Sequence, residues 1–119
     1  MTHGVEGRSR SGHLDAETAR QVAETMQALA TPSRVLILGR LRTSACPVGE
    51  LAAAIEMEQS AVSHQLRVLR QLGLVVGERR GQQVVYALHD AHVADLLDQA
   101  VAHIEHVRLG YAEPIPEAS

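Results

Sequence analysis

The stretch from residue 59 to residue 75 reads QSAVSHQLRVLRQLGLV, and it decides the fold of this chain. Apolar residues recur there every three or four positions, which is the spacing of one face of a helix. Gly73 follows the last of them and is a typical residue for ending a helix. We therefore predict a helix over residues 59–72, with a buried stripe formed by Val62, Leu66, Leu69 and Leu72.

The segment after this helix predicts a β-hairpin. Residues 74–78 and 84–88 are rich in β-branched residues, and Gly81 marks a polar turn between them. Asp90 can then cap a last helix that runs to about Gly110. The apolar positions of this last helix are Val93, Leu96, Leu97, Ala100, Val101 and Ile104.

Three helices are predicted ahead of residue 59. Asp15 can cap the first, and Thr31-Pro32 places a cap before a proline at the first position of a helix over residues 32–42. Cys46-Pro47 interrupts the chain before a short helix over residues 48–55. The first helix has apolar residues at helical spacing, namely Ala19, Val22, Ala23, Met26 and Leu29. We expect the second helix to bury Val35, Leu36, Leu38 and Leu41, and the third to turn Leu51, Ala52 and Ile55 inward.

The resulting order, α-α-α-α-β-β-α, is typical of a winged helix-turn-helix domain, mainly α with a β-hairpin wing. A length of 119 residues suggests one domain, which we place at residues 15–110, after a flexible N-terminal arm (1–14) and before a disordered tail (111–119). We find no apolar run long enough to span a membrane and no signal core, and the lone Cys46 fits a reducing compartment. We therefore expect a cytoplasmic protein.

Charge is unevenly distributed along the chain. Residues 32–88 hold seven Arg against four acids, a balance of +3, whereas residues 89–119 hold one Arg against six acids, a balance of −5. The polar face of the helix over residues 59–72 and the hairpin tip carry amides, hydroxyls and guanidinium groups, which bond base edges and phosphates. The predicted DNA-binding residues are Gln59, Ser60, Ser63, His64, Arg67 and Arg70 on the helix, and Arg79, Arg80, Gln82 and Gln83 in the hairpin.

These motifs resemble those of the ArsR/SmtB metalloregulatory repressors. The likeness rests on residues 59–75, on residues 29–38 (LATPSRVLIL) and on the hairpin with Gly81 and residues 85–88 (VYAL), and it covers roughly residues 15–108. It implies a homodimer that binds a palindromic operator in the metal-free form and releases it on binding metal, so that a metal-efflux gene is derepressed. It implies neither an enzyme nor a protein with a small organic substrate.

A metal site is predicted on the last helix. Asp90 and His92 stand at its start, and His103 and His106 lie three residues apart near its end. Eleven residues of helix rise about 16 Å, whereas metal–nitrogen bonds are about 2.0–2.1 Å long. One helix therefore cannot place all four side chains on one ion, but two antiparallel copies of it can, and a two-fold dimer would then hold two identical sites.

The identity of the metal stays open at this point. Within the family, the likeness is greatest to nickel and cobalt sensors and extends to residues 3–7 (HGVEG), so His3 and the N-terminal amine are candidate additional ligands for Ni(II) or Co(II). Three imidazoles and a carboxylate also make an adequate tetrahedral Zn(II) site. A further alternative is a winged-helix regulator with a non-metal signal, such as oxidation of Cys46. We assign His13 and His89 to the surface.

Overall fold

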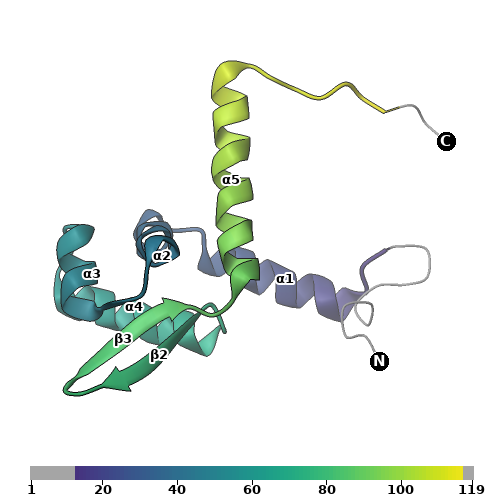
Figure 1. Ribbon diagram of the computed structural model, residues 1–119. Coiled ribbons are helices and arrows are strands. Elements are labelled where there is room, and N and C mark those ends of the chain that lie inside the picture. The colour runs from purple at the N-terminus through teal and green to yellow at the C-terminus, as the bar shows by residue number, and fades with distance from the viewer. Residues whose placement is uncertain (1–12, 117–119) are drawn as a thin grey trace.

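The structure is a computed structural model that describes residues 13–116, so His3 and most of the predicted arm lie outside the described residues. Over the described residues, five helices and three strands follow one another (Figure 1). Their bounds are α1 (Ala16–Ala28), α2 (Pro32–Thr43), β1 (Cys46–Pro47), α3 (Val48–Ala54), α4 (Gln59–Gln71), β2 (Val75–Arg80), β3 (Gln83–Leu88) and α5 (Ala91–Leu109). The predicted winged helix-turn-helix is confirmed.

Local capping explains where several helices begin and end. The carboxylate of Asp15 accepts a hydrogen bond from the backbone N–H of Thr18, and the Thr31 hydroxyl accepts one from the N–H of Arg34. These side chains satisfy donors that have no partner inside a helix. Gly73 has a φ of +75°, a left-handed conformation that suits glycine and ends the α4 segment as predicted.

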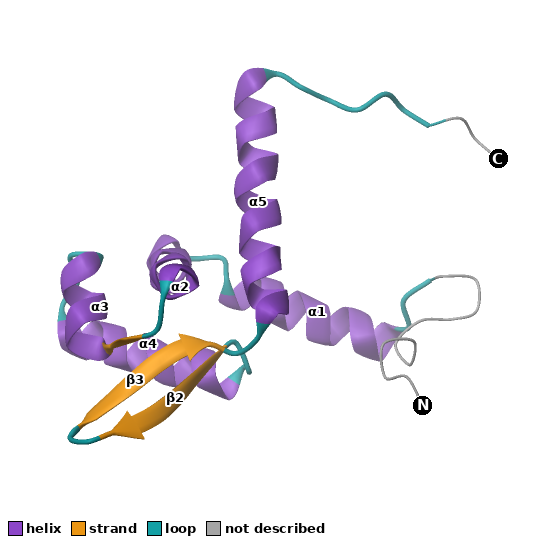
Figure 2. Cartoon of the chain, viewed as in Figure 1, coloured by secondary structure: helices purple, strands orange, loops and turns teal. Residues whose placement is uncertain are grey.

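The predicted β-hairpin is confirmed as β2 and β3, and the short strand β1, which was not predicted, adds a third strand to the sheet. Its order is β1-β3-β2, all antiparallel, with Cys46 opposite Tyr86 and Pro47 opposite Val85. Figure 2 shows β2 and β3 projecting from the helices as a long ribbon. The strands of this ribbon are longer than predicted, because the pairing of Arg80 with Gln83 leaves only residues 81–82 as the turn.

The core lies where α2, α3 and α4 meet the base of the sheet. Its fully buried large side chains are Ile37, Leu38, Leu51, Leu66, Leu69, Val62 and Val75. The prediction of burial is wrong for three residues in the single chain, because Val35, Leu36 and Leu72 remain 41%, 52% and 39% exposed. Ile37 takes the inward position on α2 instead.

Helix α5 stands away from the rest of the fold beyond its first turns (Figure 1). Only Val93 and Leu97 of this helix are buried, and its later apolar side chains, such as Val101 and Ile104, are more than half exposed. Among the described residues, no helix combines the length and the apolar character that a membrane span needs.

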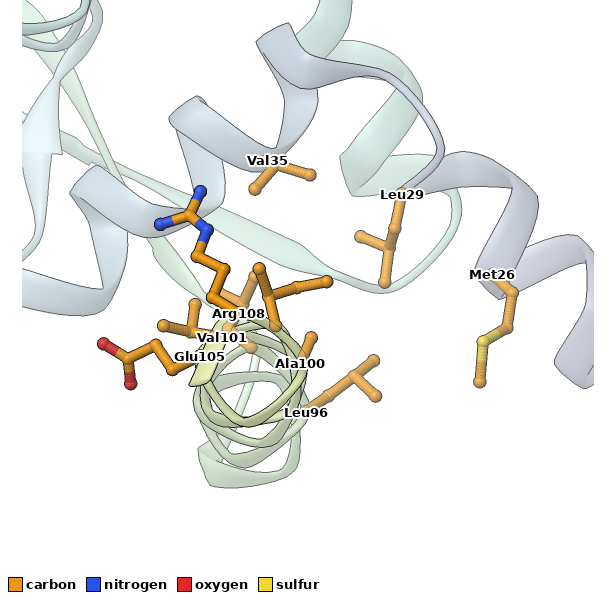
Figure 3. Close-up of a pocket in the computed structure, with 10 residues that line it drawn as sticks. Met26, Leu29, Val35, Leu96, Ala100, Val101, Glu105 and Arg108 are labelled. Carbon is orange, nitrogen blue, oxygen red and sulfur yellow. The ribbon is translucent and has the colours of Figure 1, made fainter. Parts of the chain in front are cut away.

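An apolar groove of about 550 Å³ separates α5 from α1 and α2. In Figure 3, Met26 of α1 and Leu29, which caps the end of α1, lie across this groove from Leu96 and Ala100 of α5. Arg108 of α5 lies at the rim of the groove. The apolar side chains of α5 and of the groove therefore form one apolar surface that no other part of the described chain covers.

Candidate nucleic-acid interface and candidate metal centre

The polar face of α4 is presented to solvent. Gln59, Ser60, His64 and Arg67 are exposed, as is Arg70, while Ser63 is half-buried. The opposite face is anchored, because Val62, Leu66 and Leu69 are buried in the core. The predicted helix residues therefore lie on one accessible face of a rigidly packed helix, as a helix that enters the major groove requires.

A pair of side chains fixes α4 against α2. The Gln65 amide donates to the Ser33 hydroxyl at 2.9 Å, and the Ser33 hydroxyl donates to the Gln65 carbonyl oxygen at 3.1 Å. Both side chains are part-buried, where water competes less for such bonds. Sequence reasoning did not single out this pair, because the two residues are 32 positions apart.

The wing brings further predicted residues to the same region. Arg79, Arg80, Gln82 and Gln83 are exposed, although the two arginines lie in β2 and not in the turn. Arg80 forms an exposed ion pair with Glu78 at 2.6 Å. Gln59 of α4 and Gln82 of the wing line one groove of about 430 Å³, so the first residue of α4 and the wing tip border a common space.

Asp90 acts as the N-cap of α5, as predicted. Its Oδ1 accepts hydrogen bonds from the backbone N–H groups of His92 and Val93 at 2.9 and 3.3 Å. Its Oδ2 lies 2.8 Å from Nδ1 of His89. The His89 hydrogen bond, followed by the backbone bonds, lowers the pKa of the Asp90 carboxyl, so the group is a carboxylate at neutral pH.

Asp90 and His92 also lie at a separation that suits two ligands of one ion. Oδ1 of Asp90 is 3.4 Å from Nδ1 of His92, and the His92 side chain is 95% exposed. Two donors with bonds of about 2.0–2.1 Å lie about 3.3–3.4 Å apart on a tetrahedral ion. The start of α5 thus offers half of a metal site with both donors accessible.

His103 and His106 form the second half near the other end of α5. Both are exposed, and the His106 ring packs edge-on against Tyr111 with the ring centroids 6.3 Å apart. Within residues 13–116, no three metal-ligating side chains of one chain come together. Within one chain, the structure therefore keeps the two pairs of predicted ligands apart, at opposite ends of α5.

Cys46 does not fit the redox alternative. The residue is 2% exposed and pairs with Tyr86 in the sheet. Burial raises the pKa of its thiol, and the thiolate is the form that oxidants attack. A buried, protonated thiol in a packed strand is a structural residue.

Residues 31–76, which span α2, α3, α4 and the start of β2, match the family described as bacterial regulatory protein, arsR family. Over 119 residues the chain is 62% identical to the HTH-type transcriptional regulator NmtR of Mycobacterium tuberculosis, covering 99% of each chain. The chain belongs to the ArsR family. Membership confirms the predicted class, a DNA-binding transcription regulator and not an enzyme.

The chain is also similar to a further transcriptional repressor and to two solved structures. The chain is 44% identical to the transcriptional repressor SmtB of Mycobacterium tuberculosis over 67% of its length and 59% of that protein. The solution structure of apo-NmtR superposes with a TM-score of 0.71 at 61% identity, covering 99% and 100% of the two chains. A homodimeric winged helix-turn-helix DNA-binding domain from Mycobacterium bovis superposes with a TM-score of 0.76 at 26% identity, covering 93% and 100%.

Proposed function

We propose that this ArsR-family chain is a metal-responsive repressor. It binds operator DNA as a metal-free homodimer and releases it on binding Ni(II) or Co(II), which derepresses a metal-efflux gene. The observation that carries the proposal is the half-site at the start of α5, where Asp90 and His92 present donors 3.4 Å apart. The remaining donors, His103 and His106, lie near the far end of the same exposed helix.

The exposed apolar surface supports the homodimer. The later part of α5 and the groove beside it expose apolar side chains that a monomeric protein would bury, among them Met26, Val101 and Ile104. A second copy packed with its α5 antiparallel would cover this surface and bring Asp90 and His92 of one chain to His103 and His106 of the other. Each dimer would then hold two identical sites.

The donor set fits a transition-metal ion. Imidazole nitrogens suit nickel, cobalt and zinc, and a carboxylate completes four-coordination. Asp90 and His92 of one chain and His103 and His106 of the other would hold the ion. A metal bound there would link the two α5 helices and favour one relative placement of the two α4 helices. Operator is released when this placement no longer matches successive major grooves.

Zn(II) is a second candidate effector, because three imidazoles and a carboxylate make an adequate tetrahedral site. Ni(II) prefers additional donors, and His3 with the N-terminal amine is the proposed source.

An operator titration tests the proposal. Binding to a duplex from the promoter of the efflux gene is measured by mobility shift, without metal and with saturating Ni(II), Co(II) or Zn(II). We expect at least one metal to weaken binding about 5- to 150-fold, the usual range of allosteric coupling. Asp90→Asn keeps a good helix cap but removes the anionic ligand, so it should bind operator normally and lose the metal response. Operator affinity that no metal changes in the wild type would refute the proposal.

The electronic absorption of the Co(II) and Ni(II) forms distinguishes the metals. Strong bands indicate four-coordination and weak bands six-coordination. A Ni(II) spectrum that His3→Ala leaves unchanged would remove the N-terminal arm from the site.

A further inference from the structure

We propose that His89 is a positioning residue of the metal half-site, which holds the Asp90 carboxylate in the orientation that ligates the ion. This inference rests on the proposed metal-sensing function. His89 was assigned to the surface from the sequence, and its side chain is indeed 48% exposed. The structure adds a specific partner, because its Nδ1 lies 2.8 Å from Oδ2 of Asp90.

The two oxygens of Asp90 have different tasks. Oδ1 caps α5 through two backbone N–H groups and is the oxygen near His92. Oδ2 takes no part in that cap and accepts from His89. A carboxylate can only accept, so the imidazole must carry its proton on Nδ1. The hydrogen bond therefore restrains the rotation of the carboxylate while Oδ1 stays directed toward the side on which His92 lies.

The backbone of His89 is itself anchored. Its N–H donates to the carbonyl oxygen of Leu74 at 2.9 Å, and Leu74 is buried. The imidazole therefore extends from a fixed point between β3 and α5. This anchor keeps the imidazole beside Oδ2 while Asp90 is free of metal, so that ordering the carboxylate costs little when the ion arrives.

Hydrogen bonds to a ligating side chain typically raise metal affinity 10- to 100-fold. The His89 and Asp90 side chains are 48% and 43% exposed, so we expect the lower end of this range. Removing the imidazole should weaken Co(II) binding about tenfold. The ligands of the ion would be unchanged, because His89 bonds Oδ2 of Asp90, whereas Oδ1 is the oxygen near His92.

The test compares His89→Ala with His89→Asn, because the amide N–H of asparagine can replace the Nδ1 donor. His13→Ala is the control for the loss of any imidazole, since His13 lies ahead of α1. Co(II) affinity of the full-length chain is measured by competition with a chelator, together with the Co(II) absorption spectrum and operator affinity without metal. We expect about tenfold weaker Co(II) binding in His89→Ala, recovery in His89→Asn, and an unchanged spectrum and operator affinity in all variants.

Three results would overturn this role. Unchanged or tighter Co(II) binding in His89→Ala would show that the hydrogen bond does not assist the ion or competes with it. A changed Co(II) spectrum in His89→Ala, without recovery in His89→Asn, would make His89 a ligand. Failure of the wild-type chain to bind Co(II) would refute the proposed metal site itself, and the role of His89 with it. If instead release of operator by metal needs Asp90 but not His89, only the role of His89 is refuted.

Discussion

The contact between Ser33 and Gln65 offers a direct test of how α4 is held for DNA binding. The two side chains exchange two hydrogen bonds of 2.9 and 3.1 Å between α2 and α4, both part-buried. A typical hydrogen bond contributes about 0.5–1.5 kcal/mol net to stability. We therefore expect Gln65→Ala to lower the free energy of unfolding by about 1–3 kcal/mol, where the upper figure applies if Ser33 finds no new partner.

A double-mutant cycle separates the contact from other effects of the two substitutions. Ser33→Ala, Gln65→Ala and the double variant are unfolded in urea at one fixed protein concentration. The coupling free energy between the two positions should be about 1 kcal/mol or more. Gln71→Ala is the matched control, because Gln71 is an exposed glutamine at the end of the same helix. Operator affinity should fall in Gln65→Ala and not in Gln71→Ala. Additive effects of the two alanines on stability would refute the reasoning.

Three further predictions follow from the described contacts. Arg67→Ala removes an exposed cation from α4 and should weaken operator binding. If the Arg67 side chain contacts phosphate, the slope of log affinity against log salt concentration should also fall by about 1. An unchanged slope in a salt titration would contradict that contact. Arg42 lowers the pKa of Asp98 through a two-point ion pair between α2 and α5. A lowered folded-state pKa adds stability above the unfolded pKa, and this stability is lost as pH falls through the folded one. Asp98→Asn should therefore unfold more easily than wild type at pH 7, and urea curves should show the difference shrinking as pH falls below the ordinary Asp range. Buried Cys46 should react with iodoacetamide only on unfolding, and mild peroxide should leave operator affinity unchanged; fast alkylation of the native protein would restore the redox alternative.

Local signals in the sequence were enough to predict most of the fold. The stripe of Val62, Leu66 and Leu69 and the left-handed Gly73 define α4, and the cap at Asp90 defines the start of α5. These features depend on residues within a few positions of each other, so a single sequence contains the information.

The features that were missed depend on partners far along the chain or on a second copy. Strand β1 has two residues and exists only because Cys46 pairs with Tyr86, forty positions later. Leu36 was predicted as core because periodicity marks an apolar face without showing what covers it. The bond between His89 and Asp90 is an exception, because it joins neighbouring residues; it was missed because it depends on the turn that joins β3 to α5.

The candidate metal site, predicted as two half-sites, stays a prediction. Asp90 and His92 lie together at one end of α5, and His103 and His106 lie at the other. Completion of the site by a second copy stays a prediction.

The separation of the half-sites along α5 has a genetic consequence. A chain that lacks His92 and a chain that lacks His103 and His106 would each form homodimers without a complete site. In a mixed dimer, however, one site would take its start-of-helix ligands from one chain and its end-of-helix ligands from the other, and all four would be intact. A mixed dimer of two chains that each fail to respond to metal should therefore regain up to one working site, although the two kinds of homodimer would still bind operator in the presence of metal.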